Sequence, residues 1–188
     1  MDNSRYNDGL SIRTEEGGQR YITGLALPWW NGESGSEYEI EDGYFERFEK
    51  GSVKWDTVVA NIQHMNSHLI GITPDTLSLK ESKRGIEFEI TLDDSSFSRD
   101  AEIMVAKRKL RGASIEFRKP TFDYQREGNK NVVYVRSAQL RGISLVARPA
   151  YKSTEAYLRD VSEMALTQIY NKRADDLLNT VIPQVVKR

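Results

Sequence analysis

Apolar and polar residues alternate along much of this chain, a pattern typical of β-strands with one buried face. It is clearest in residues 77–81 and 86–92, which flank the turn-prone segment 82–85 and predict a β-hairpin. Further alternating or β-branched runs occupy residues 21–27, 58–64, 131–136 and 139–146. Strands so numerous, with few helical segments between them, favour a mostly antiparallel barrel or sandwich over a doubly wound fold.

Helical patterns are fewer. Residues 98–110 begin with Ser98, continue with acidic residues and end with Lys107, Arg108 and Lys109, as suits a helix dipole. Residues 44–48 suit a short amphipathic turn of helix, and from residue 153 an apolar stripe with helical spacing begins. The sequence therefore predicts a mostly β protein with flanking helices, of the α+β class, and a helical C-terminal tail.

The organisation along the chain follows from these patterns. Residues 1–19 are polar and predict a flexible N-terminal arm. Residues 20–152 contain the predicted strands and form one β-barrel domain. Residues 153–188 form a helical C-terminal region, which we expect to pack on the domain or to serve assembly and dimerisation.

The composition of the chain excludes several classes of function. The chain has 188 residues with 27 basic and 28 acidic side chains, so a net charge of -1 offers no electrostatic basis for binding nucleic acid or an anionic membrane. The absence of cysteine excludes disulfides, thiolate metal sites and a cysteine nucleophile. The N-terminus lacks the apolar run of a signal peptide, and no apolar stretch is long enough to span a membrane. We therefore expect a soluble intracellular protein.

The candidate chemistry lies in a serine and a histidine. His64 ends the run 58–64, and Ser114 lies in the segment 112–117. A serine hydroxyl is a weak nucleophile until a base within hydrogen-bond reach takes its proton, so such a pair suits acyl transfer. His64 and His68 are four residues apart, but the His-Glu-x-x-His pattern is missing and the local pattern is that of a strand. We expect neither a metal site nor a cofactor.

Three motifs follow one another in a recognisable order. The first is Asn61-Ile62-Gln63-His64 with Gly71 seven residues after the histidine, the second is Gly112-Ala113-Ser114-Ile115-Glu116-Phe117, and the third runs from Leu140 through Ile143-Ser144-Leu145-Val146 to Pro149-Ala150. Together they resemble the prohead maturation proteases of tailed bacteriophages, serine peptidases whose fold is similar to that of herpesvirus assemblins. The resemblance covers residues 21–156 and implies an assemblin-like antiparallel β-barrel wrapped by helices.

The resemblance also implies a function. It assigns Ser114 as the nucleophile and His64 as the general base of a serine endopeptidase that needs no cofactor. Its substrates would be the scaffold, the scaffolding segment of the major capsid protein and the protease itself, including its own tail. It would act inside the assembling procapsid in the host cytoplasm, as a homodimer or higher oligomer.

Two departures from the family pattern concern the third catalytic group. Many members carry an acidic residue, which orients the histidine, where this chain has Gly142, and a glycine where it has Glu116. The orienting role could fall to Ser144, to a water in the space that Gly142 leaves, or to Glu116 reaching across. Arg141 and Arg148 flank the last strand and would either support an oxyanion or lie at a solvated strand edge.

Two other functions fit the pattern. A catalytically weak or inactive assembly or scaffolding protein of the same fold is consistent with the loss of the acidic residue at position 142. A small-ligand-binding barrel would contain a closed apolar cavity and no solvent-facing Ser/His pair. In either case Ser114 would be an ordinary small residue at a close backbone approach.

Overall fold

The computed structural model describes residues 10–14 and 18–147. Its first sheet has the order β1-β2-β8-β7, and all three of its strand pairs are antiparallel. The strands are β1 (Ser11–Thr14), β2 (Arg20–Pro28), β7 (Leu77–Glu81) and β8 (Gly85–Leu92). The hairpin predicted from the alternation in residues 77–92 is therefore confirmed.

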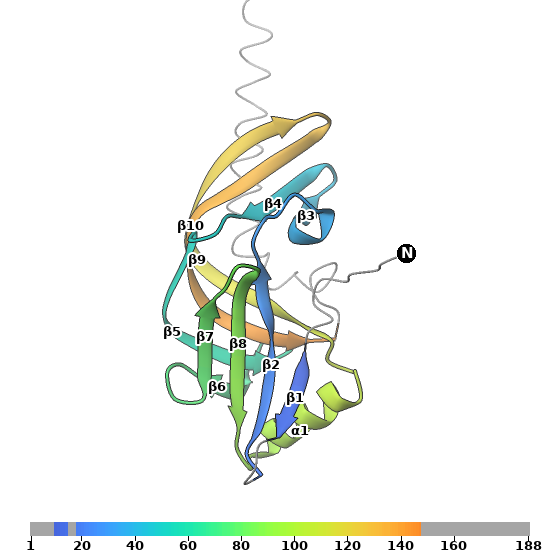
Figure 1. Cartoon of the computed structure of the whole chain (residues 1–188), viewed down its shortest axis with the longest axis vertical. Helices are drawn as coiled ribbons and strands as arrows, with labels where there is room; N and C mark the ends of the chain where they lie inside the picture. The colour runs from blue at the N-terminus through green and yellow to red at the C-terminus, as the bar shows by residue number, and fades with distance from the viewer. Residues whose placement is uncertain (1–9, 15–17, 148–188) are drawn as a thin grey trace, which may run out of the picture.

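The second sheet is organised around one long strand, β10 (Lys130–Val146). Strand β9 (Gly112–Glu127) pairs with β10 antiparallel over nearly its whole length, and the two form the long curved hairpin in yellow and orange in Figure 1. The opposite edge of β10 pairs in parallel first with β4 and then with β5. The outer strands complete the order β3-β4-β10-β5-β6. Their bounds are β3 (Tyr38–Glu41), β4 (Tyr44–Phe48), β5 (Val53–Ile62) and β6 (Met65–Ile72).

The prediction of a mostly β, mostly antiparallel fold is confirmed, but the two parallel pairs of β10 correct it in detail. The helical turn predicted at 44–48 is wrong, because these residues form β4 between β3 and β10. Part of the expected N-terminal arm is also a strand, since β1 pairs with β2. The C-terminal helix predicted from residue 153 lies outside the described residues.

The helix predicted at 98–110 is α1 (Ser96–Ala106), which begins and ends a little earlier than the sequence pattern indicates. Its N-cap is Ser95, whose side chain accepts a hydrogen bond from the backbone N–H of Ser98 at 3.2 Å. A 3-10 turn, η1 (Ser34–Ser36), also lies in the described part of the chain. No helix in that part is long and apolar enough to cross a membrane.

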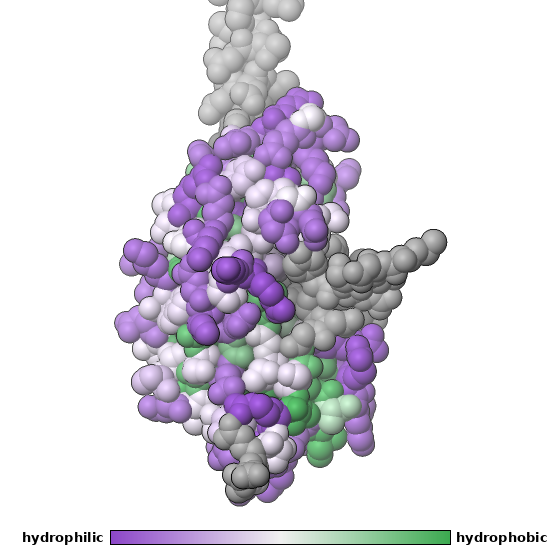
Figure 2. Space-filling model, in the orientation of Figure 1, coloured by the Kyte–Doolittle hydropathy of each residue, from purple (hydrophilic) through white to green (hydrophobic). Residues whose placement is uncertain are grey.

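The hydrophobic core lies between the two sheets. Fully buried aliphatic side chains come from β2 and β8 on one side and from β5 and β10 on the other, for example Ile22, Ile90, Val58 and Ile143. Burying such a side chain stabilises the fold by about 1.5–3 kcal/mol. The face of the molecule in Figure 2 is mostly hydrophilic, and hydrophobic surface gathers at the end where β1 and α1 lie.

The side chains of β9 and β10 that pack in the core also determine which side chains lie on the opposite face of the sheet. Ala113 and Ile115 of β9 and their partners Leu145 and Ile143 of β10 belong to the core. Because side chains alternate along a strand, Ser114 and Ser144, which lie between them, occupy the opposite face of the sheet. The polar residues singled out in the sequence therefore gather on the face away from the hydrophobic core.

Candidate functional site

His64 lies in the tight turn that joins β5 to β6. Ile62 pairs with Met65, so Gln63 and His64 form a two-residue hairpin turn with φ angles of 54° and 58°. Type I′ hairpin turns require positive φ at both central residues, a backbone that is uncommon outside glycine and in which asparagine, aspartate and histidine are enriched. The histidine thus belongs to the turn and not to the strand end where the sequence placed it, and the turn brings its ring over the neighbouring strands.

Three polar residues form a row across the strands beside this turn. Ser114 of β9 lies directly opposite Ser144 of β10, and Ser144 lies directly opposite Asn61 of β5. Residues directly opposite each other in a sheet share a face, so the three side chains are neighbours. All three are buried, and Asn61 and Ser144 completely so. The predicted nucleophile therefore belongs to a continuous polar row.

The ring of His64 has its Nδ1 atom against this row. Nδ1 lies 3.0 Å from Ser144 Oγ and 3.1 Å from Glu116 Oε1. Ser144 in turn donates a hydrogen bond to Asn61 Oδ1 at 2.6 Å. The other ring nitrogen, Nε2, is buried and has no hydrogen-bond partner among the described residues. An ionised carboxylate accepts but cannot donate, so the arrangement favours a proton on Nδ1 and a free lone pair on Nε2.

Glu116 reaches His64 because the residue opposite it is a glycine. Glu116 and Gly142 are direct partners in the β9–β10 ladder. A Cβ atom on Gly142 would lie 3.1 Å from Glu116 Oε2 and 3.3 Å from its Cδ, so the carboxyl group occupies the space over the glycine. Of the three orienting groups that the sequence left open, Glu116 and Ser144 both contact Nδ1, and Glu116 fills the space proposed for a water.

Ser114 is close to this cluster without being hydrogen-bonded to His64. Within residues 10–14 and 18–147 its hydroxyl makes no hydrogen bond, and the ring contacts its cross-strand neighbour Ser144 instead. Side chains directly opposite in an antiparallel pair have Cβ atoms about 4.5–5.5 Å apart. Catalytic hydrogen bonds are often long before substrate binds and shorten in the complex. The register thus brings the two predicted catalytic residues to the same place.

The other candidates lie apart or outside the described region. The ring of His68 packs edge-on against Phe97, with 4.6 Å between ring centroids, and does not reach the cluster. Arg141 lies at a bulge of β10, where neither ladder pairs it, and its side chain makes no hydrogen bond or ion pair with the described residues. Arg148 lies outside them. No cluster of three or more His, Cys, Asp or Glu suited to a metal occurs in the described part of the chain.

Sequence reasoning missed one member of the cluster. Asn61 belongs to the first of the three motifs, and nothing in that motif indicates a role for it, although it is fully buried and hydrogen-bonded to Ser144. A signal was present, because an asparagine within the β-branched run 58–62 needs hydrogen-bond partners once it is buried. The identity of the partner depended on the parallel pairing of β5 with β10.

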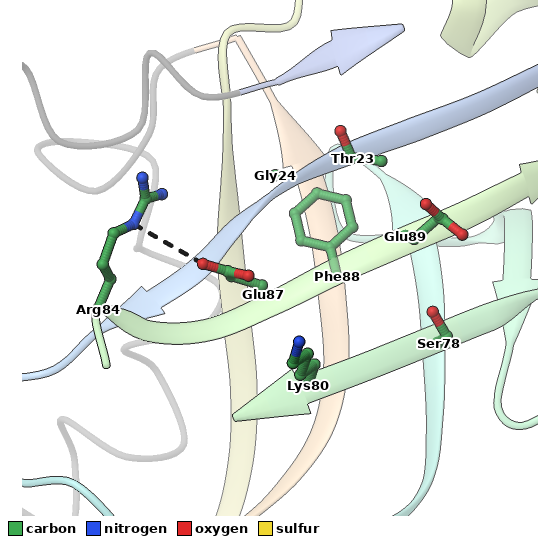
Figure 3. A pocket seen from close by; sticks show the side chains of 8 residues that line it. All are labelled: Thr23, Gly24, Ser78, Lys80, Arg84, Glu87, Phe88 and Glu89. Carbon is green, nitrogen blue, oxygen red and sulfur yellow. Dashed lines mark ion pairs between the residues drawn. The ribbon is translucent and has the colours of Figure 1, made fainter. Parts of the chain in front are cut away.

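A surface hollow lies on the other sheet, away from this cluster. It is lined by Thr23, Gly24, Ser78, Lys80, Arg84, Glu87, Phe88 and Glu89. Figure 3 shows the ring of Phe88 beside Gly24, with charged side chains around it and an ion pair of 3.8 Å between Arg84 and Glu87. The hollow is open and largely polar, so it is not the closed apolar cavity that a ligand-binding barrel would contain.

Comparison with known proteins identifies the family of the chain. The family model described as caudovirus prohead serine protease matches residues 9–167, which include every residue of the cluster. No curated protein and no solved structure matches the chain. Because the match spans most of the chain, including β1 to β10, the protein belongs to the family of caudovirus prohead serine proteases.

Proposed function

We propose that the protein is a serine endopeptidase of procapsid maturation in which Ser114 is the nucleophile and His64 the general base. The observation that carries the proposal is the state of the His64 ring. Its Nδ1 lies within hydrogen-bond distance of Glu116 and Ser144, and its Nε2 is buried with no partner among the described residues, which leaves the Nε2 lone pair for the hydroxyl of Ser114 in the row next to the ring. Family membership supplies the reaction class, a serine peptidase.

The mechanism follows from these positions. Ser114 Oγ attacks the carbonyl carbon of the scissile peptide bond while His64 Nε2 takes the hydroxyl proton. The Glu116 carboxylate holds the ring and stabilises the imidazolium that forms. The imidazolium then returns the proton to the leaving amine as the C–N bond breaks, and a water molecule hydrolyses the acyl-enzyme by the same route. Arg141 and Arg148 are the candidates for stabilising the oxyanion.

The substrate surface would include two exposed apolar residues next to the cluster. Met65 follows His64 in the turn and is 48% exposed, and Leu69 lies opposite Asn61 in the β5–β6 ladder and is 45% exposed. Both would contact apolar side chains of an extended peptide. We propose the scaffold, the scaffolding segment of the major capsid protein and the chain's own C-terminal region as substrates, cleaved inside the procapsid by a homodimer or higher oligomer.

The alternative is an inactive assembly protein of the same fold. Its main support was the absence of an acidic residue at position 142. Glu116 weakens that support, because a carboxyl group 3.1 Å from His64 Nδ1 is present from the opposite strand. The alternative is kept because the Ser114 hydroxyl and the His64 ring are not hydrogen-bonded.

The test exploits the two serines that face each other across β9 and β10. The parent, Ser114→Ala, His64→Ala and Ser144→Ala proteins are each expressed with the capsid protein of the same phage, and intact masses are followed over time. We expect cleavage of the capsid protein and trimming of the chain in the parent, neither product in Ser114→Ala or His64→Ala, and reduced but measurable cleavage in Ser144→Ala.

Two outcomes would contradict the proposal. Unchanged masses in all four proteins would favour the assembly protein. Abolished cleavage in Ser144→Ala with retained cleavage in Ser114→Ala would reverse the roles of the two serines. Circular dichroism of each variant checks that it has folded.

A further inference from the structure

Asn61 lies at the buried end of the polar row and contacts His64 only through Ser144. Its side chain is fully buried, its Oδ1 atom accepts a hydrogen bond from Ser144 Oγ at 2.6 Å, and its Nδ2 atom has no partner among the described residues. A buried amide group with half of its hydrogen-bonding capacity unused is costly, and such groups call for an explanation. Its position behind the catalytic histidine offers one.

Proton counting links this amide to the histidine. A serine hydroxyl has one proton to donate and can accept through its lone pairs. When the proton of Ser144 goes to Asn61 Oδ1, the contact between Ser144 Oγ and His64 Nδ1 at 3.0 Å requires Nδ1 to be the donor. The separation of 2.6 Å between Ser144 Oγ and Asn61 Oδ1 is typical of O–H···O bonds and short for N–H···O bonds.

The opposite orientation of the amide would reverse every bond in the row. If Nδ2 of Asn61 donated to Ser144, the hydroxyl proton of Ser144 would be free to go to His64 Nδ1. The ring proton would then lie on Nε2, and a protonated Nε2 cannot accept the proton of Ser114. The orientation of one buried amide and the usable tautomer of the base are therefore coupled through Ser144.

We propose that Asn61 is a positioning residue that, through Ser144, holds His64 in the tautomer with its proton on Nδ1. This inference rests on the proposed function only for its consequence in catalysis. The Glu116 carboxylate acts on the same nitrogen from the solvent side, with its side chain 35% exposed, and Asn61 acts from the buried side. The two acceptors together keep Nε2 unprotonated and ready for the hydroxyl of Ser114.

The test is nitrogen NMR of the histidine imidazole rings in the full chain. The protein carries Ser114→Ala, because this substitution prevents self-cleavage. The chain has two histidines, so His68, which packs on Phe97, is the internal reference. At a pH where the rings are neutral, we expect His64 to have its proton on Nδ1. Adding Asn61→Leu removes one of the two acceptors and frees the hydroxyl proton of Ser144 to go to Nδ1. This variant should raise the population of the tautomer with the proton on Nε2, against the remaining pull of Glu116 on Nδ1. Adding Ser144→Ala to that protein should return His64 to the Nδ1 tautomer, because no hydroxyl remains to donate.

A second variant leaves the buried amide of Asn61 intact, so it tests the inference even if Asn61→Leu does not fold. Glu116→Ala changes a partly exposed side chain and leaves the Asn61–Ser144 pair as the remaining acceptor at Nδ1. We expect His64 to stay in the Nδ1 tautomer in this protein. A proton mainly on Nε2 in Glu116→Ala, or in the Ser114→Ala parent, would overturn the inference. Unchanged tautomer populations in folded Asn61→Leu would overturn it as well.

Peptidase activity, measured in proteins that retain Ser114, gives an independent check of the role of Asn61. Asn61→Leu should lower kcat roughly tenfold with little change in KM, the size expected for one hydrogen bond. Its effect should vanish in a Ser144→Ala background, because residues that act through one another are not additive. If the losses in kcat from Asn61→Leu and Ser144→Ala were additive, the proposed action of Asn61 through Ser144 would be wrong. Absence of activity in the parent would instead contradict the proposed function and leave the tautomer measurement standing on its own.

Discussion

The two ends of the β9–β10 hairpin bury polar groups in opposite ways. At the far end, Glu37, Arg47, Glu127, Lys130 and Tyr134 form an ion-pair cluster. Arg47 binds Glu37 and Glu127 at 2.8 and 2.7 Å and stacks on Trp30, with 3.6 Å from its Cζ to the ring centroid. Lys130 also pairs with Glu37, and no buried side-chain atom of these five residues lacks a partner. At the site end, both His64 Nε2 and Asn61 Nδ2 lack one in the described structure.

The difference is the one expected between a structural cluster and the catalytic cluster that we propose. Burial alone would lower the pKa of Arg47, but its hydrogen bonds to Glu127, Glu37 and Tyr134 raise it above the ordinary value, so its charge is secure. A satisfied network stabilises one arrangement, whereas a free lone pair is available for a reaction. The buried atoms without partners at the site end fit the proposed catalytic role, and mutations at the two ends should therefore have different consequences.

The largest effect is expected from the carboxylate at the site end. Glu116→Gln keeps the shape but removes the charge that stabilises the imidazolium, and loss of the third triad group can cost about 10⁴-fold in turnover. We expect a fall of about 10²–10⁴-fold in kcat, with the free energy of unfolding nearly unchanged, as measured by peptide cleavage and urea denaturation.

A matched variant sharpens this prediction. Glu116→Gly combined with Gly142→Glu moves the carboxylate to the opposite strand at the same level of the ladder. The double variant should regain much of the activity, whereas Gly142→Ala alone should displace Glu116, because the new Cβ would lie 3.1 Å from its Oε2. Full activity in Glu116→Gln would remove Glu116 from the mechanism.

The ion-pair cluster should show the reverse behaviour. Arg47→Met leaves the buried Glu37 carboxylate without its principal partner, and breaking a buried ion pair from one side costs about 3–5 kcal/mol. We expect a loss of this size in urea denaturation and an unchanged kcat/KM in the fraction that remains folded. A fall in kcat/KM of the folded protein would mean that the two ends are coupled.

A pH dependence of stability is expected next to that cluster. Glu46 is buried in β4, and burial raises its pKa from 4.5 to about 8. The folded state therefore binds this proton more tightly than the unfolded state, and its contribution is lost as the pH rises from about 4.5 to about 8. Glu46→Gln should remove this loss, which is on the order of 2–4 kcal/mol, when unfolding is compared at pH 5 and pH 8. If the free energy of unfolding depended on pH in the same way in the parent and in Glu46→Gln, Glu46 would not be the source of the loss.

The smallest effect is expected from a single hydroxyl in the ion-pair cluster. Tyr134 donates to Glu127 at 2.7 Å and accepts from Arg47 at 2.9 Å. Tyr134→Phe should cost about 1 kcal/mol of stability. It should also raise the pKa of Glu127, which is lowered first by the hydrogen bond from Tyr134 and then by that from Arg47. Side-chain carboxyl NMR titration reports this shift.

Local patterns predicted those elements whose partners are near in sequence. The hairpin of β7 and β8 and the helix α1 were predictable because their hydrogen bonds form within about twenty residues. Residues 44–48 were misread because a short run of aromatic and charged residues suits a helix or a strand equally. The strand is decided by β10, whose Asn131 to Val135 pair with Tyr44 to Phe48 from far along the chain.

The sequence by itself determined which chemical groups the site contains. They are Ser114 and Ser144, each two residues after a glycine, His64 seven residues before Gly71, and Glu116 two residues after Ser114 on the same strand face. The tertiary structure decided how they combine. Glu116 lies over Gly142, and Ser144 lies between Ser114 and Asn61, because the bulge at Arg141 sets the register of β9 against β10. A shift of one residue would turn these side chains to the other face, and such long-range register leaves no local trace in the sequence.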